Sequence, residues 1–191
     1  MADDDVLILI DQQKAMEHPK WGPRNNPDAE QNIAHLLAAW RRRKIPVIHV
    51  RHDSTFPDSP FRPGQEGNDF KPLTAPLPGE TVIAKRVTSA FIGTDLARRL
   101  DEMGKPSLVI CGVLLANSVE ATVRVGANLG YRIRIPADAC WSCDKRDLTG
   151  RLWPAEDVHQ LTLALLDGEY ASVTTTDALV GSLSRAGSRS S

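Results

Sequence analysis

The sequence predicts a single α/β domain in which helices cover both faces of a mostly parallel β-sheet. Short runs of β-branched residues alternate with longer segments of helical period, a pattern typical of repeated strand–helix–strand units. The chain of 191 residues has the length of one domain and can bury a sizeable core. Hydrophobic residues make up 41% of it and charged residues 25%, which is typical of a globular protein.

The first strand is expected over residues 6–10, because this apolar run is typical of a central strand that is buried on both faces. Asn26 as N-cap and Pro27 at the first helical position then begin the first helix. Further strands are expected over residues 47–50, 81–84, 108–111, 132–135 and 171–174, and further helices over 95–103, 116–129 and 155–166. Residues 1–181 would form the domain, and the small polar segment 182–191 a flexible tail.

Charge and composition exclude several classes of partner. The formal net charge of −1 provides no basic field that would attract nucleic acid or an anionic membrane. No apolar stretch approaches the length of a membrane span, and the acidic start of the chain is unlike a signal peptide. The three cysteines are too few to staple a domain of this size, so they fit reduced thiols. These features predict a cytoplasmic protein without nucleic-acid or membrane partners.

Three polar features follow predicted parallel strands: Asp11, Lys85 and the turn that carries Ser118. Ligands of open α/β sheets bind at the carboxyl ends of the strands, so we expect these groups to meet there. A carboxylate, an ammonium and a hydroxyl that converge suit acyl transfer. Each residue alone also has a structural explanation: a turn acceptor, a solvated strand end and a small residue in a first helical turn.

The segment 54–80 is a long loop, rich in Pro, Gly and Asp, with no sustained period. A loop of this length within a compact domain is often functional, for example as a lid or a pocket wall. No glycine-rich fingerprint follows the first strand, which argues against a nucleotide-binding Rossmann module.

The motifs and their order resemble the isochorismatase-like cysteine hydrolases from about Val6 to Leu179. Asp11-Gln12-Gln13 corresponds to the D-x-Q with which that family opens. Lys85 followed by Ser-Ala-Phe-Ile-Gly-Thr-Asp-Leu at 89–96 corresponds to a highly specific family segment. The segment 112–124 corresponds to the helix start that carries the family's cysteine.

The resemblance implies a Rossmann-like three-layer αβα sandwich with a six-stranded, mostly parallel sheet. It implies an Asp-Lys-Cys triad that hydrolyses amides, lactams, ureas or a vinyl ether without a cofactor. By this resemblance Asp11 accepts the proton, Lys85 stabilises charge, and Ser118 occupies the position of the cysteine. The oxyanion hole would consist of the backbone N–H groups of Leu114 and Ser118, with a cis peptide bond between Val113 and Leu114.

The substrate expected from the resemblance is a small amide or lactam. Gln13, Trp21, Phe91, Leu115 and Asn117 are the side chains expected to contact it, with Leu115 at a position where the family usually has Thr. The pocket wall is expected to include Trp21, the loop 56–70, Phe91, Leu114 and Leu115, with Trp141 as a further candidate. This apolar lining suits a compact, weakly polar ligand better than a dicarboxylate.

A serine at the nucleophile position changes the chemistry. A cysteine in the first turn of a helix is activated, because the helix dipole favours its thiolate near neutral pH. A serine hydroxyl gains little from the same position, and Lys85 favours the ionised, weakly basic form of Asp11. We therefore expect the chain as written to be weakly active or inactive. Two explanations stay open: a Cys→Ser replacement that traps substrate, or natural divergence, including a pseudo-hydrolase that binds a small molecule or protein partner.

The remaining candidates have simpler explanations. Cys111 is a rival nucleophile near the same strand end, although a buried strand cysteine is the commoner case. Cys140 and Cys143 have the spacing of half a zinc site, without a second pair. The metal-holding Asp-x-His of the nicotinamidases has no counterpart at 51–53, so we predict no metal. The resemblance also implies homodimers or homotetramers, with the Trp153 region and the 54–80 loop as candidate interfaces.

Overall fold

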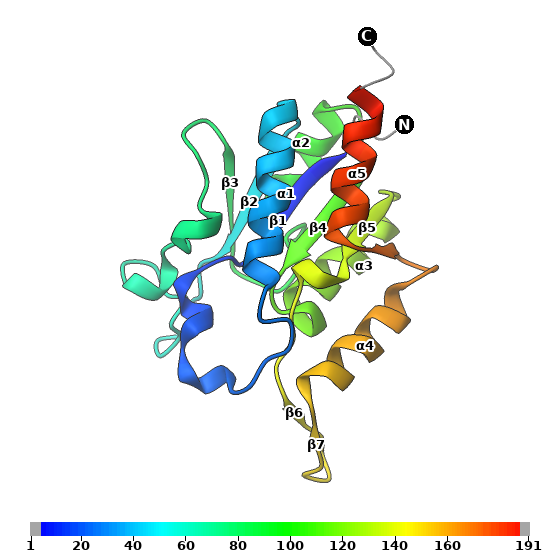
Figure 1. The fold of residues 1–191 in the computed structure, drawn as a ribbon. Helices are drawn as coiled ribbons and strands as arrows, with labels where there is room; N and C mark the ends of the chain where they lie inside the picture. The colour runs from blue at the N-terminus through cyan, green and yellow to red at the C-terminus, as the bar shows by residue number, and fades with distance from the viewer. Residues whose placement is uncertain (1–4, 188–191) are drawn as a thin grey trace.

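Six parallel strands form the central sheet, in the order β3-β2-β1-β4-β5-β8, in a computed structural model that describes residues 5–187 (Figure 1). The fold class and the six-stranded sheet predicted from the sequence are thereby confirmed. The strands are β1 (Val6–Ile10), β2 (Val47–His52), β3 (Thr81–Lys85), β4 (Leu108–Gly112), β5 (Ile133–Pro136) and β8 (Ser172–Thr174). A separate two-stranded hairpin projects from the lower end of the molecule in Figure 1 and consists of β6 (Lys145–Arg146) and β7 (Leu152–Trp153).

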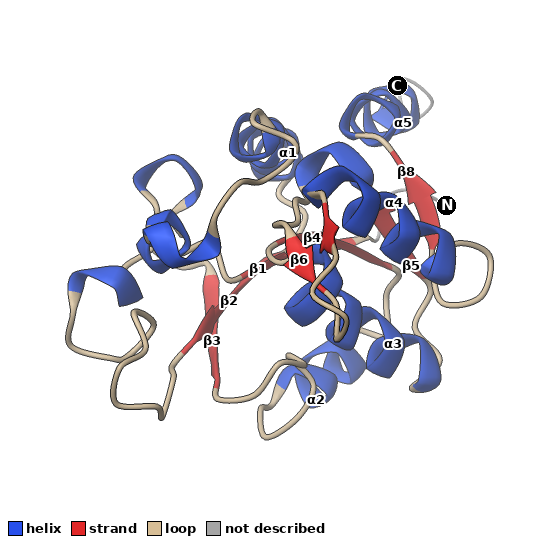
Figure 2. Cartoon of the chain, turned by 90° about the horizontal axis from the view of Figure 1, so that it is seen from below, coloured by secondary structure: helices blue, strands red, loops and turns tan. Residues whose placement is uncertain are grey.

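Helices cover both faces of the sheet, which gives the three layers expected. The helices are α1 (Ala29–Arg43), α2 (Leu96–Glu102), α3 (Glu120–Asn128), α4 (Ala155–Leu166) and α5 (Thr176–Gly187). Figure 2 shows α1 and α5 on one face and α2 and α3 on the other. Short 3₁₀ helices cover Lys14–Glu17, Pro19–Trp21, Glu66–Asn68, Pro72–Thr74 and Ala137–Ala139, and a π-helical turn covers Leu115–Val119. Among the helices of the described chain, none combines the length and the apolar composition that a membrane span requires.

The middle strand β1 is buried along its whole length, as its uninterrupted apolar sequence predicts. It pairs with β2 on one side and with β4 on the other, in registers that place Ile10 beside both Val50 and Gly112. The neighbouring pair places His52 beside Lys85 at the end of β3. The carboxyl ends of four strands therefore lie at one edge of the sheet, where the polar residues that follow them can meet.

The start of α1 differs from the sequence prediction. The helix begins at Ala29 and its N-cap is Asp28, so Asn26 is not the cap. Asn26 has a positive φ of 45°, and its side-chain amide donates hydrogen bonds to the carbonyls of Ala137 at 3.0 Å and Cys140 at 2.7 Å. Asn26 therefore contacts residues more than a hundred positions away in the sequence and does not cap α1. The periodicity of the helix could not predict this contact.

The C-terminal prediction is wrong over residues 182–187, because α5 continues through them. Leu179 and Leu183 are four residues apart on this helix, and both are buried in the main core. The Leu183 carbonyl also accepts a hydrogen bond from the Arg43 guanidinium at 2.9 Å, which attaches α5 to α1. The last part of the expected tail, residues 188–191, lies outside the described residues.

We expect Leu183→Ala to lower the free energy of unfolding by about 2–5 kcal/mol, because it leaves a cavity at a buried position. The measurement is urea denaturation followed by circular dichroism. Leu129→Ala, at an exposed leucine, serves as the control and should change stability by less than about 0.5 kcal/mol. Equal stabilities for the two variants would show that the end of α5 is not packed against the core.

Candidate active site

Three of the polar residues singled out in the sequence meet at the carboxyl edge of the sheet. Asp11 follows β1, Lys85 ends β3, and Ser118 lies in the π-helical turn between β4 and α3. The Lys85 Nζ donates a hydrogen bond to Asp11 Oδ2 at 2.8 Å and another to Ser118 Oγ at 3.3 Å. One ammonium group thus joins a carboxylate to the hydroxyl at the expected nucleophile position.

The three side chains are buried. Lys85 is 1% exposed, Asp11 4% and Ser118 7%. Water therefore screens the Asp11–Lys85 ion pair little, and each charge depends on the other for its stability. The second carboxylate oxygen, Asp11 Oδ1, is also buried and has no hydrogen-bond partner among the described residues. One oxygen of Asp11 is therefore hydrogen-bonded to Lys85, and the other has no hydrogen-bond donor within the described part of the chain.

A cavity of about 160 Å³ opens above these groups. It is small compared with sites for drug-sized ligands, which span roughly 300–1,000 Å³. Its apolar lining consists of Met16, Trp21, Phe56, Phe61, Val113 and Leu114, and its polar lining includes Lys20, His52, Ser54, Ser59, Thr88 and Asn117. Part of the long 54–80 loop is therefore a pocket wall, as predicted. A larger surface hollow near Tyr131 and Glu169 contains none of the three polar residues.

The turn after β4 brings backbone groups to the cavity. The predicted cis peptide bond between Val113 and Leu114 is present. The Leu114 N–H donates no hydrogen bond within the described part of the chain, and Leu114 lines the cavity. The Leu114 carbonyl, by contrast, accepts hydrogen bonds from the N–H groups of Asn117 at 3.1 Å and Val119 at 3.2 Å. The turn is thus held through its carbonyl, while the N–H stays available for a ligand.

This geometry agrees with the comparison of the chain with known proteins, in which residues 5–178 match the family profile described as the isochorismatase domain. The chain belongs to the isochorismatase family. It is 37% identical over 180 residues to the isochorismatase family protein YrdC of Bacillus subtilis, a match that covers 94% of this chain and 96% of that protein.

Structural comparison gives the same family. A hydrolase of the isochorismatase family from Chromobacterium violaceum superposes with a TM-score of 0.94 and 51% identity, over 96% of this chain and 95% of the other. In the sequence comparison, a streptothricin hydrolase of Streptomyces noursei is 33% identical over 139 residues, which are 70% of this chain and 48% of that protein. The protein is therefore an isochorismatase-family hydrolase by sequence and by fold.

His52 belongs to the site of this family member, although the sequence interpretation gave it no role. It ends β2 beside Lys85, lines the cavity, and packs edge-on against Phe61 with ring centroids 5.5 Å apart. Its Nδ1 is buried without a partner in the described chain. Burial, followed by the nearby Lys85 charge, lowers the pKa of His52 and favours the neutral imidazole. Its position at a strand end next to Lys85 was the signal that could have identified it.

Three of the five residues expected to contact the substrate do not line the cavity. Gln13 is fully buried, and its amide group hydrogen-bonds with the backbone N–H and C=O of His52. Phe91 stacks on Tyr131 with ring centroids 5.5 Å apart, and Leu115 is fully buried in the main core. Trp21 and Asn117, the other two, do line the cavity.

The cysteines of the chain are free and buried. Burial raises the pKa of the Cys111 thiol well above its usual range and that of Cys140 to about 12, so neither provides a thiolate near neutral pH. The raised pKa of Cys111 fits a buried structural cysteine rather than a rival nucleophile. Across residues 5–187, no group of three His, Cys, Asp or Glu side chains is arranged to hold a metal ion.

Proposed function

We propose that this chain binds a small amide or lactam in the cavity and that its site is built for cofactor-free hydrolysis of the C–N bond. The observation that carries the proposal is the position of the Lys85 ammonium between Asp11 and Ser118, which both line a small cavity with apolar and polar walls. The sequence similarity to a streptothricin hydrolase also supports a hydrolytic site, because that relative is named as a hydrolase.

The roles of the residues follow from their positions when a cysteine is present at position 118. Asp11 Oδ1 takes the thiol proton while the sulfur attacks the carbonyl carbon of the substrate. The N–H groups of Leu114 and residue 118 bind the oxyanion, and each such donor contributes roughly 3–4 kcal/mol to transition-state stability at comparable sites. The C–N bond then breaks, the amine leaves with the proton from Asp11, and water hydrolyses the thioester.

The serine in this chain favours binding over turnover. Its Oγ accepts a hydrogen bond from Lys85, and no neutral base contacts it among the described residues. The alternative function is a pseudo-hydrolase that binds a small molecule or a protein partner without turnover. Assaying a panel of small amides and lactams with the chain as written and with Ser118→Cys separates the two.

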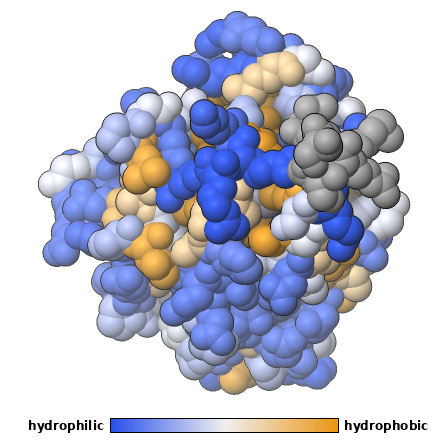
Figure 3. Space-filling model, turned by 45° about the horizontal axis from the view of Figure 1, so that its top comes forward, coloured by the Kyte–Doolittle hydropathy of each residue, from blue (hydrophilic) through white to orange (hydrophobic). Residues whose placement is uncertain are grey.

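We also propose that the chain forms homodimers or homotetramers through the β6–β7 hairpin and the neighbouring α4. Four exposed leucines lie on these elements, at positions 148, 152, 161 and 165. The opposite end of the molecule is mainly hydrophilic, with hydrophobic side chains in separate small patches (Figure 3). Light scattering should give a mass of at least twice 20.9 kDa. A monomer at micromolar concentration would contradict this proposal.

A further inference from the structure

The outer walls of the cavity come from irregular segments of the chain, outside the central sheet. Residues 14–26 contribute Met16, Lys20 and Trp21, and the loop 54–71 contributes Phe56 and Phe61 among others. The two segments meet at the cavity, where the rings of Trp21 and Phe61 pack edge to face with centroids 6.1 Å apart. One such aromatic contact contributes about 0.5–1.5 kcal/mol, so further contacts must hold these walls.

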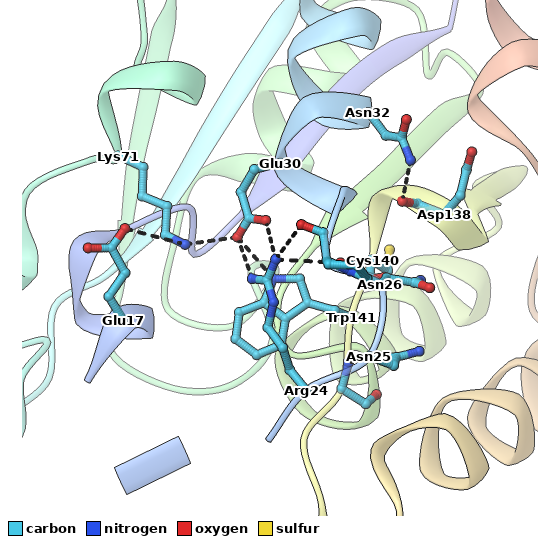
Figure 4. Close-up of polar contacts among 12 residues, drawn as sticks. Glu17, Arg24, Asn25, Asn26, Glu30, Asn32, Lys71, Asp138, Cys140 and Trp141 are labelled. Carbon is cyan, nitrogen blue, oxygen red and sulfur yellow. Dashed lines mark hydrogen bonds and ion pairs between the residues drawn. The ribbon is translucent and has the colours of Figure 1, made fainter. Parts of the chain in front are cut away.

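The same two segments also meet at the carboxylate of Glu30, in the first turn of α1 (Figure 4). Arg24, from the first segment, forms a two-pronged ion pair with Glu30, with N···O distances of 2.7 and 2.6 Å. Lys71, at the end of the second segment, donates from its Nζ to Glu30 Oε1 at 2.8 Å.

A third segment reaches the same carboxylate. The indole Nε1 of Trp141 donates to Glu30 Oε1 at 3.2 Å, and the Arg24 guanidinium lies over the Trp141 ring, 4.5 Å from its centroid. The carbonyl of Trp141 accepts a hydrogen bond from the N–H of Leu115 at 2.9 Å, directly beside Leu114 of the cavity. Glu30 is therefore connected to the cavity on three sides.

The charges of Glu30, Arg24 and Lys71 favour a stable ion-pair cluster. Glu30 is 9% exposed and Lys71 8%, so water screens their attraction little. Burial opposes ionisation of Glu30, but the hydrogen bonds from Arg24 and Lys71 outweigh it and lower the pKa of Glu30 to about 2. Glu17, 3.8 Å from the Lys71 Nζ, adds a negative charge at the surface. The carboxylate thus stays charged throughout the neutral range.

We infer that Glu30 is a positioning residue, whose carboxylate holds segments 14–26 and 54–71 together and thereby fixes the aromatic side of the substrate cavity. The inference rests on the proposed function only for the identity of what the cavity binds. Arg24 holds segment 14–26 to Glu30, and Lys71 holds segment 54–71. Removal of either cation should therefore loosen mainly its own segment.

Glu80 provides a matched control. It is also a carboxylate in a two-pronged ion pair, with Arg41 at 2.7 and 2.9 Å, and its pKa is likewise lowered to about 2. It precedes β3 at the opposite edge of the sheet from Lys85, and it does not line the cavity. Any general cost of losing an ion-paired carboxylate should therefore appear in Glu80→Gln, but an effect on the cavity should not.

The experiment measures amide hydrogen exchange by mass spectrometry in Glu30→Gln, Glu80→Gln, Arg24→Met and Lys71→Met. We expect Glu30→Gln to accelerate exchange in residues 14–26 and 54–71 roughly tenfold to a hundredfold, the factor for one lost charge-assisted hydrogen bond. Arg24→Met should act mainly on 14–26 and Lys71→Met mainly on 54–71. Faster exchange spread evenly over the chain, or equal effects of Glu30→Gln and Glu80→Gln, would overturn the inference.

Kinetics in the Ser118→Cys background provides the second measurement. Glu30→Gln should raise KM about tenfold with little change in kcat, because it loosens the binding walls and leaves Asp11 and Lys85 in place. Glu80→Gln should change neither constant. A lower kcat at constant KM would contradict a positioning role. If Ser118→Cys hydrolyses nothing, the proposed function fails, and the exchange pattern still decides the inference about Glu30.

Discussion

Ser118→Cys is expected to raise the hydrolysis of small amides and lactams by roughly three or more orders of magnitude, because it supplies the missing nucleophile. The surroundings for a thiolate are already present. Lys85 Nζ lies 3.3 Å from the Ser118 Oγ, and the turn leads directly into α3, whose N-terminal dipole favours a negative charge. Initial rates across an amide and lactam panel provide the measurement.

Two controls determine what such a gain means. Ser118→Ala, which has no nucleophile, should stay as inactive as the chain as written. Adding Asp11→Ala to the Ser118→Cys variant should abolish the gain, since Asp11 lines the same cavity as residue 118 and its Oδ1 has no hydrogen-bond partner among the described residues. Activity that survives this second change would remove Asp11 from the role of proton acceptor. No gain with any amide or lactam would favour the pseudo-hydrolase.

The positions of Asp11, Lys85 and Ser118 could be predicted because each depends on one local rule. A polar residue at the carboxyl end of a parallel strand, or in the turn that follows it, lies at the carboxyl edge of the sheet. The direction of a neighbouring side chain follows no such rule. Gln13 lies two residues after Asp11, yet its amide hydrogen-bonds with the backbone of His52 and Gln13 does not line the cavity. Closeness in sequence to a site residue therefore did not predict a position in the cavity wall.

The helix α5 was missed although the sequence contains its signal. Leu179 and Leu183 have the spacing of one helix face, and the Thr175 hydroxyl accepts a hydrogen bond from the N–H of Ala178 near the helix start. The small polar residues around them concealed this pattern. The role of Glu30 had no such signal, because its partners Arg24, Lys71 and Trp141 come together only through tertiary folding.

Lys85→Met is expected to lower the free energy of unfolding by about 3–5 kcal/mol, because it leaves the Asp11 carboxylate buried without its cation. Methionine is similar in length to lysine, so the loss of stability reflects the missing charge more than a change in side-chain volume. Lys85 is 1% exposed and its Nζ lies 2.8 Å from Asp11 Oδ2, so water cannot replace the ammonium without opening the site. Urea denaturation at pH 7 measures the effect.

The pair can be isolated by a double-mutant cycle. Asp11→Asn removes the negative charge, so the Asp11→Asn/Lys85→Met double variant should be more stable than Lys85→Met alone. Lys14→Met is the control, because Lys14 forms its ion pair with the exposed Glu66 at 3.2 Å, and its loss should leave the unfolding free energy nearly unchanged. A double variant no more stable than Lys85→Met would mean that the two charges do not depend on each other. The ammonium would then serve catalysis through its contact with residue 118 alone.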